Sequence, residues 1–149
     1  MRESKMNMAL RNKFAQQYAN TYVETAASEA TPHKLIEMLY EGVLKHLNLS
    51  KFFMEQKNFE KKSEHMNRSL EILNSLRQGV DLEKGKEVGG NLFDLYDYCY
   101  RRAFEGSSKN SVEMVDEVIL LMKELDDAWK QMPDDIKRIS KEQIENIRV

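Results

Sequence analysis

Apolar residues recur along residues 31–54 at the three- and four-residue spacing of a helix. Thr31 can accept hydrogen bonds from the first free N–H groups and Pro32 suits the first helical position, so we expect the helix to begin at Pro32. Its apolar positions form two stripes, about 100° apart around the helix. The first stripe is Leu35, Leu39, Leu49 and Phe53. The second stripe is Ile36, Tyr40, Val43, Leu47 and Met54.

Together the two stripes span roughly 240°, whereas a helix with one buried side needs little more than about 100°. Something must therefore cover the second stripe. One interpretation is that the helix lies centrally in a bundle and that its own chain covers both stripes. The other is that the second stripe forms a groove for a partner helix.

Two further amphipathic helices follow. The second helix is expected to run from Phe59 to Gly79, which can close it in a left-handed conformation. A charged turn around Gly85 then leads to a third helix, from Glu87 to Gly106. The predicted buried positions of these helices are Phe59, Met66, Leu70, Leu73, Leu76, Val88, Leu92, Leu95, Tyr96, Cys99 and Ala103.

A fourth helix is predicted after a loop at residues 107–110. Asn110 and Glu113 have the spacing of a capping box, and Pro133 ends the helix. Its predicted buried positions are Val115, Val118, Met122, Leu125, Trp129 and Met132. Four long helices with short connections predict an all-α fold, an antiparallel four-helix bundle over residues 32–132. We expect the 149 residues to form a single domain.

The two ends of the chain are predicted to be less regular. Residues 1–13 are polar and uncapped, so we expect them to be disordered. Phe14, Tyr18 and Tyr22 recur every four residues and predict a short helical segment. That segment is either packed permanently on the bundle or a removable cover over the second stripe. Residues 133–149 are expected to form a tail with room for a short helix.

Composition excludes several classes of function. The 23 basic and 25 acidic residues are interspersed and give a net charge of −2, which disfavours binding to nucleic acid or to a membrane surface. No apolar run approaches the roughly 20 residues that cross a bilayer, and we expect no membrane insertion. The only cysteine, Cys99, cannot form an intrachain disulfide, which fits a cytoplasmic protein.

Enzyme chemistry finds no support in the motifs. None of the three histidines has a glutamate three residues before it, as a di-iron bundle requires, and no phosphate-binding loop or nucleophile motif occurs. His46 is interpreted as a hydrogen-bonded core histidine. Cys99 is interpreted as a small buried hydrophobe rather than a nucleophile. We therefore expect no catalytic activity, no metal and no cofactor.

The sequence TPHKLIEMLYEGVL at residues 31–44 resembles the signature T-A-S-P-x-x-L-I-x-M-L-Y-[DE]-G-x-[LI] of the FliS family, the flagellin-specific export chaperones of the bacterial flagellum. Later blocks appear in the family's order, including SLR at residues 75–77 and NLFDLYDY at residues 91–98. The resemblance covers residues 18–132.

The resemblance implies a bundle that binds the disordered C-terminal segment of flagellin in the cytoplasm, prevents its premature polymerisation and helps deliver it to a component of the flagellar export gate. The residues expected to bind flagellin are Ile36, Leu39, Tyr40, Val43 and Leu47. The residues expected to gate this site are Phe14, Tyr18 and Tyr22. We expect a monomer before binding. The alternative is a structural bundle that buries the same stripe in a homodimer.

Overall fold

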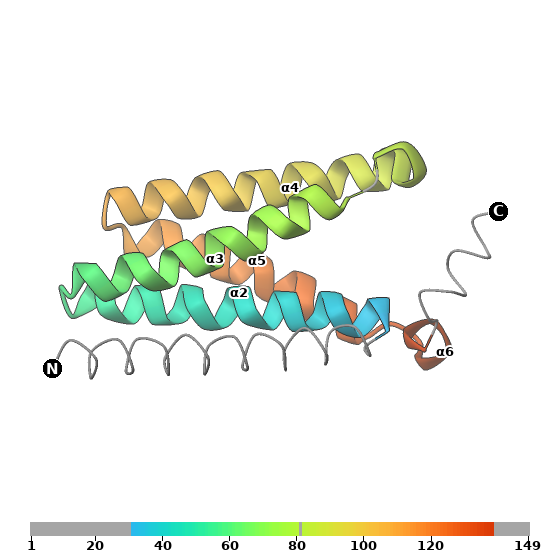
Figure 1. Cartoon of the computed structure of the whole chain (residues 1–149), viewed down its shortest axis with the longest axis horizontal. Helices are drawn as coiled ribbons and strands as arrows, with labels where there is room; N and C mark the ends of the chain where they lie inside the picture. Colours follow the sequence, from blue (N-terminus) through green and yellow to red (C-terminus); the bar gives the residue numbers. More distant parts are fainter. Residues whose placement is uncertain (1–30, 81, 139–149) are drawn as a thin grey trace, which may run out of the picture. The chain divides into compact units, whose positions relative to one another are not determined.

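The computed structural model describes residues 31–80 and 82–138, and within these ranges the regular secondary structure is entirely helical (Figure 1). The chain divides into two compact units. One is Ile36–Met132, and the other combines Met1–Leu35 with Pro133–Val149. The described part of the second unit holds the start of helix α2 and the short helix α6, Asp134–Lys137. The predicted all-α fold is confirmed.

Helix α2 spans Pro32–Glu55 and begins where the sequence predicts. The hydroxyl of Thr31 accepts a hydrogen bond from the backbone N–H of Lys34, with 3.2 Å between the two atoms. This bond satisfies one of the N–H groups that the first turn of a helix leaves without a partner. A two-residue turn after Glu55 includes Lys57 in the left-handed region, at a φ of 59°.

Helix α3 spans Phe59–Gly79, the predicted range, but its two terminal residues differ from the prediction in conformation and burial. Gly79 is the last helical residue, and the chain leaves through Val80 in an extended conformation, so the predicted left-handed cap at Gly79 is wrong. Phe59 is also not in the core. It occupies the first position of the helix, where its side chain is 46% exposed and lies against the ammonium of Lys62.

Helix α4 spans Leu82–Ser108, so the predicted turn around Gly85 is helical instead and the predicted start at Glu87 is wrong. Gly106, predicted to end this helix, lies inside its last turn. Its lack of a side chain lets α5 approach closely, because a Cβ atom there would lie 3.0 Å from the Cβ of Met114. The glycine therefore serves packing between helices rather than helix termination.

Helix α5 spans Val112–Lys130, and its N-cap is Ser111 rather than the predicted Asn110. The hydroxyl of Ser111 accepts a hydrogen bond from the backbone N–H of Met114. Asn110 adopts a left-handed conformation, with a φ of 50°, and its side-chain oxygen accepts a hydrogen bond from the ammonium of Lys62. The same ammonium donates to the carbonyl of Ser107, which ties the start of α3 to the turn between α4 and α5.

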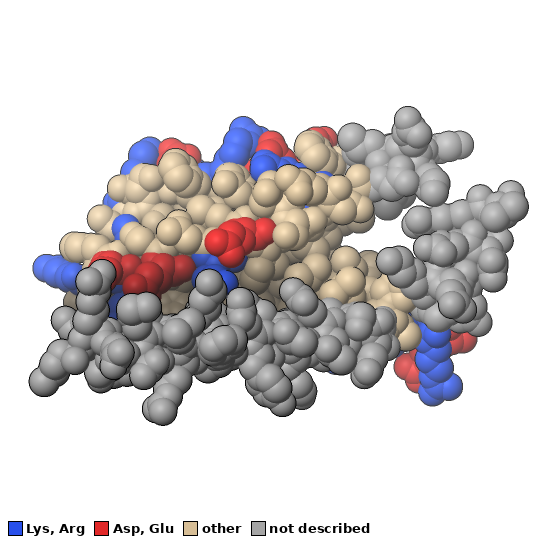
Figure 2. Space-filling view, viewed as in Figure 1, with Lys and Arg blue, Asp and Glu red and all other residues tan. Residues whose placement is uncertain are grey.

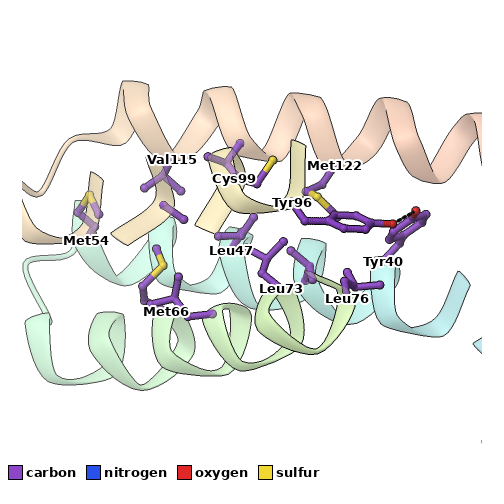
Figure 3. Packing of buried hydrophobic residues seen from close by; sticks show 14 residues of the cluster. Tyr40, Leu47, Met54, Met66, Leu73, Leu76, Tyr96, Cys99, Val115 and Met122 are labelled. Atoms are coloured by element: carbon purple, nitrogen blue, oxygen red, sulfur yellow. Dashed lines mark hydrogen bonds between the residues drawn. The ribbon is translucent and has the colours of Figure 1, made fainter. Parts of the chain in front are cut away.

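Within residues 36–132, consecutive helices run in opposite directions, as Figure 1 shows, and the predicted four-helix bundle is confirmed. Apolar side chains from α2, α3, α4 and α5 meet in one core (Figure 3). The core residues are Tyr40, Val43, Leu47, Met54, Met66, Leu70, Leu73, Leu76, Tyr96, Cys99, Ala103, Val115, Val118 and Met122. Among residues 31–80 and 82–138, no helix is long and apolar enough to cross a membrane.

Candidate functional site

The second stripe of α2 is the one that builds the core. Tyr40, Val43 and Leu47 have at most 1% of their surface exposed, and Met54 has 4%. All four belong to one core cluster with side chains of α3, α4 and α5, and Figure 3 labels three of them, Tyr40, Leu47 and Met54. Of the two interpretations of this stripe, the structure supports the one in which the bundle itself covers it, so Tyr40, Val43 and Leu47 form no open groove. The homodimer that would have buried the same stripe loses its interface for the same reason.

Ile36 and Leu39 differ from the other three predicted binding residues. Both are only partly buried, and both pack against the core from its edge. They are the members of the predicted set that a partner can reach without opening the bundle. The predicted gate residues Phe14, Tyr18 and Tyr22 lie outside the described residues. Binding of flagellin by these residues stays a prediction.

Tyr40 joins two other aromatic residues at the end of the core. Its hydroxyl is 2.6 Å from the hydroxyl of Tyr96, as the dashed line in Figure 3 marks. Its ring meets the ring of Trp129 edge to face, with 6.0 Å between the centroids. Burial is the main reason that the pKa values of Tyr40 and Tyr96 lie above the ordinary tyrosine value, so both hydroxyls stay protonated at neutral pH.

A charged group borders this aromatic cluster on α5. Asp126 is only 4% exposed, and its Oδ2 atom accepts a hydrogen bond from the ammonium of Lys130 at 2.9 Å. Lys130 also forms an ion pair with Glu41 of α2, at 3.4 Å. The other oxygen of Asp126, Oδ1, is buried and has no hydrogen-bond partner. No pattern in the sequence marks this aspartate, because acidic residues in helices usually face water.

His46 and His65 bring α2 and α3 together at a second polar contact. Their Nδ1 atoms are 3.1 Å apart, their rings stack, and the ring of Phe53 stacks on His65. His46 is hydrogen-bonded as predicted, but it is partly exposed rather than in the core. In the described ranges, no group of three or more histidine, cysteine or acidic side chains could hold a metal ion.

Cys99 is fully buried, which confirms its predicted place in the core. Burial, more than the nearby charge of Glu117, raises the pKa of the thiol to about 12. A thiol with such a pKa is almost entirely protonated at neutral pH. Cys99 therefore lacks the thiolate that a nucleophile requires.

A hollow of mixed polar and apolar lining between α3 and α4 was not predicted. It is an open pocket of about 380 Å³, lined by Leu70, Tyr100 and Phe104 together with three polar residues. Phe104 is 57% exposed there, although phenylalanine is usually buried. Its four-residue spacing from Tyr100 was the signal in the sequence that could have indicated this surface.

Charges on the described surface are mixed. In the view of Figure 2, basic and acidic side chains lie next to one another along the upper edge, and neither kind forms a continuous patch on that face. Several of them are paired, as in the contact of Glu117 with Tyr98 and Arg102 between α4 and α5. The pKa of Glu117 is lowered by its hydrogen bonds from Tyr98 and Arg102, which favour the charged carboxylate.

Comparison with known proteins places this architecture in a family. Residues 14–135 match the family described as Flagellar protein FliS. The chain is 39% identical over 116 residues to the flagellar secretion chaperone FliS of Salmonella typhimurium, a match that covers 77% of this chain and 86% of the relative.

Two other relatives give the same result. The flagellar secretion chaperone FliS of Vibrio cholerae is 35% identical over 118 residues, which are 79% of this chain and 87% of the relative. The protein of the same name from Escherichia coli is 37% identical over 120 residues, which are 80% of this chain and 88% of the relative. The family match at residues 14–135 spans the four helices of the bundle, α2 to α5.

Proposed function

This chain belongs to the FliS family of flagellar secretion chaperones, and we propose that the export substrate it holds is flagellin, bound through the disordered C-terminal segment. A chaperone role in flagellar export, with an export substrate as partner and without catalytic activity, follows from the family. We further propose that binding occurs in the cytoplasm, keeps flagellin from polymerising early, and assists its delivery to the export gate by a monomeric chaperone.

The observation that carries the proposal is the apolar surface that α2 keeps outside the core. The core already uses Tyr40, Val43 and Leu47, yet Ile36 and Leu39 remain partly exposed at its edge. An amphipathic segment that folds on binding can cover such a surface, because apolar burial offsets the entropy lost when the segment becomes ordered.

The five predicted binding residues then have two different roles. Ile36 and Leu39 contact the flagellin segment directly. Tyr40, Val43 and Leu47 hold α2 against the bundle and thereby fix the positions of the first two. Substituting a buried member of the set would lower stability as well as affinity, whereas substituting Ile36 or Leu39 should lower affinity with a smaller loss of stability, because these two are only partly buried.

The test is calorimetric titration with a peptide of the flagellin C-terminus from the same organism. We expect one-to-one binding by the wild-type protein, with a gain of helix by circular dichroism and a negative heat-capacity change. Ile36→Asp and Leu39→Asp should each weaken binding by at least about tenfold, because a carboxylate would be desolvated in the interface.

Phe52→Asp is the matched control. Phe52 lies on the same helix and is 53% exposed, so this variant adds the same charge away from the proposed contact. Loss of affinity in the first two variants with normal binding by the control supports the proposal. Normal affinity in all three variants would exclude α2 as the binding surface.

The predicted gate is tested by deleting residues 1–22, which contain Phe14, Tyr18 and Tyr22. A segment that covers the site lowers the apparent affinity by the fraction of time that the site is open. We therefore expect the shortened protein to bind the peptide more tightly or to associate with it faster. Unchanged kinetics would mean that these residues do not gate the site.

A further inference from the structure

The buried carboxylate of Asp126 has an unused acceptor. Its Oδ1 atom is the one buried side-chain nitrogen or oxygen, among the described residues, that has no hydrogen-bond partner. A desolvated carboxylate oxygen without a donor is unfavourable, so such atoms are rare in folded proteins. A donor that arrives with a partner would remove this penalty.

The charges around Asp126 favour a positively charged donor. The carboxylates of Asp126 and Glu41 both contact one ammonium, that of Lys130, at 2.9 and 3.4 Å. Two negative charges at one positive charge leave this contact with an excess of negative charge. A cationic side chain would neutralise that excess, and a neutral donor would not.

The position of Asp126 allows a partner to reach it. The side chain of Lys130 is 43% exposed while its ammonium touches Asp126, so the carboxylate lies within one side-chain length of solvent. The nearby hydroxyl of Tyr40 is hydrogen-bonded to Tyr96 and does not donate to Oδ1 of Asp126. The carboxylate therefore lies where α5 meets α2, the helix that carries Ile36 and Leu39.

We propose that Asp126 determines specificity by accepting a hydrogen bond, through Oδ1, from a lysine or arginine side chain of the bound flagellin segment. This inference rests on the proposed function. Ile36 and Leu39 provide apolar contact that many amphipathic segments could satisfy. Asp126 would favour a segment, bound at the one position along α2, that places a lysine or arginine side chain where α2 and α5 meet.

The experiment measures binding of the flagellin C-terminal peptide to the wild-type protein and to Asp126→Asn, and thermal unfolding of both free proteins. Asparagine keeps the shape but loses the charge. We expect Asp126→Asn to lower affinity by about 10- to 100-fold, the range for a lost hydrogen bond to a charged group. Thermal unfolding of the free protein measures separately the stability lost when the ion pair of Asp126 with Lys130 is removed, since Oδ1 itself loses no partner.

A peptide series tests the same contact without altering the chaperone. Each lysine or arginine of the peptide is replaced in turn by glutamine and titrated against the wild-type protein and Asp126→Asn. One of these replacements should weaken binding to the wild-type protein by about the same factor as Asp126→Asn does. The same replacement should have almost no effect on binding to Asp126→Asn, because the two changes remove the same interaction. Asp116→Asn, which removes another α5 carboxylate that contacts α2, should bind every peptide within about twofold of the wild-type protein.

Failure of the inference and failure of the proposed function give different results. Two results would overturn the role of Asp126 and leave the proposed function intact. One is equal affinity of the wild-type protein and Asp126→Asn for the peptide. The other is weaker binding by Asp126→Asn with every peptide of the series, so that no single replacement removes the difference between the two proteins. A wild-type protein that binds no flagellin peptide would overturn the proposed function and this inference with it.

Discussion

The two sides of α2 meet their neighbours in different ways. Toward α3, polar groups are matched, since the hydroxyl of Ser50 donates to the carbonyl of Lys62 and His46 pairs with His65. Toward α5, the aromatic contact of Tyr40 lies next to a carboxylate with an unused oxygen. The α3 side has the features of a permanent interface. The α5 side keeps one buried carboxylate oxygen without a hydrogen-bond donor, and such unfavourable features concentrate where proteins bind partners.

The largest expected effect comes from breaking the core that both sides share. Leu47 is fully buried between the other helices, so Leu47→Ala should lower the free energy of unfolding by about 2–5 kcal/mol. Urea denaturation measures this loss. Phe52→Ala on the solvent side of the same helix should stay within about 0.5 kcal/mol of the wild-type protein. Equal losses in both variants would contradict the assignment of the two faces of α2.

A smaller effect is expected from the buried contact of Tyr40 with Tyr96, which joins α2 to α4 next to the aromatic contact with α5. Tyr40→Phe removes one hydroxyl and leaves the buried hydroxyl of Tyr96 without its partner, which should cost about 1–3 kcal/mol. The double variant Tyr40→Phe with Tyr96→Phe should recover part of that loss, because it leaves no unpaired group. Denaturation of the three variants forms a double-mutant cycle, and simple additivity would show that the two hydroxyls do not interact.

The α3 side should respond to pH. Burial, followed by the nearby charges of His65, Lys45 and Arg68, lowers the pKa of His46 in the folded protein. The unfolded chain therefore binds more protons as the pH falls through about 6.5, and stability should decrease between pH 7 and pH 5.

The expected size of this decrease is below about 1 kcal/mol, because His46 is partly exposed and solvent screens its interactions. His46→Gln should make the unfolding temperature less dependent on pH over this range. A steeper dependence in the variant than in the wild-type protein would contradict the lowered pKa.

The smallest effect is expected from a surface ion pair between α2 and α5. Lys51 and Asp116 are 2.7 Å apart, but both side chains are substantially exposed. Lys51→Met should therefore change the free energy of unfolding by no more than about 1 kcal/mol, and added salt should reduce the difference further. A loss as large as that of Leu47→Ala would mean that charge, rather than apolar packing, holds these helices together.

The sequence allowed the helices to be predicted better than their ends. The bounds of α3 and the start of α2 at Pro32 are as predicted, because apolar periodicity and a Thr-Pro start are strong local signals. The turn predicted at Gly85 failed because glycine weakens a helix by only about 1 kcal/mol, which packing of the rest of α4 can offset. The cap of α5 was misplaced by one residue, since Asn110 and Ser111 are both good caps.

The candidate site was harder to predict. Periodicity showed that α2 has two apolar stripes, but it could not show which one faces the core, because that depends on where α3, α4 and α5 lie. Tyr40 was therefore assigned to the binding surface, although its side chain is buried in the core. Asp126 had no sequence signal at all, since its buried state arises from neighbours distant in sequence.

The buried thiol of Cys99 has a practical consequence for experiments on this protein. A fully covered, protonated thiol resists air oxidation and alkylating reagents, and it is the only cysteine in the chain. A dimer observed without reductant would thus not be a disulfide artefact. A new cysteine at an exposed position such as Leu120 could be labelled with a maleimide dye while Cys99 stays in place, so fluorescence could follow client capture in an otherwise unaltered chain.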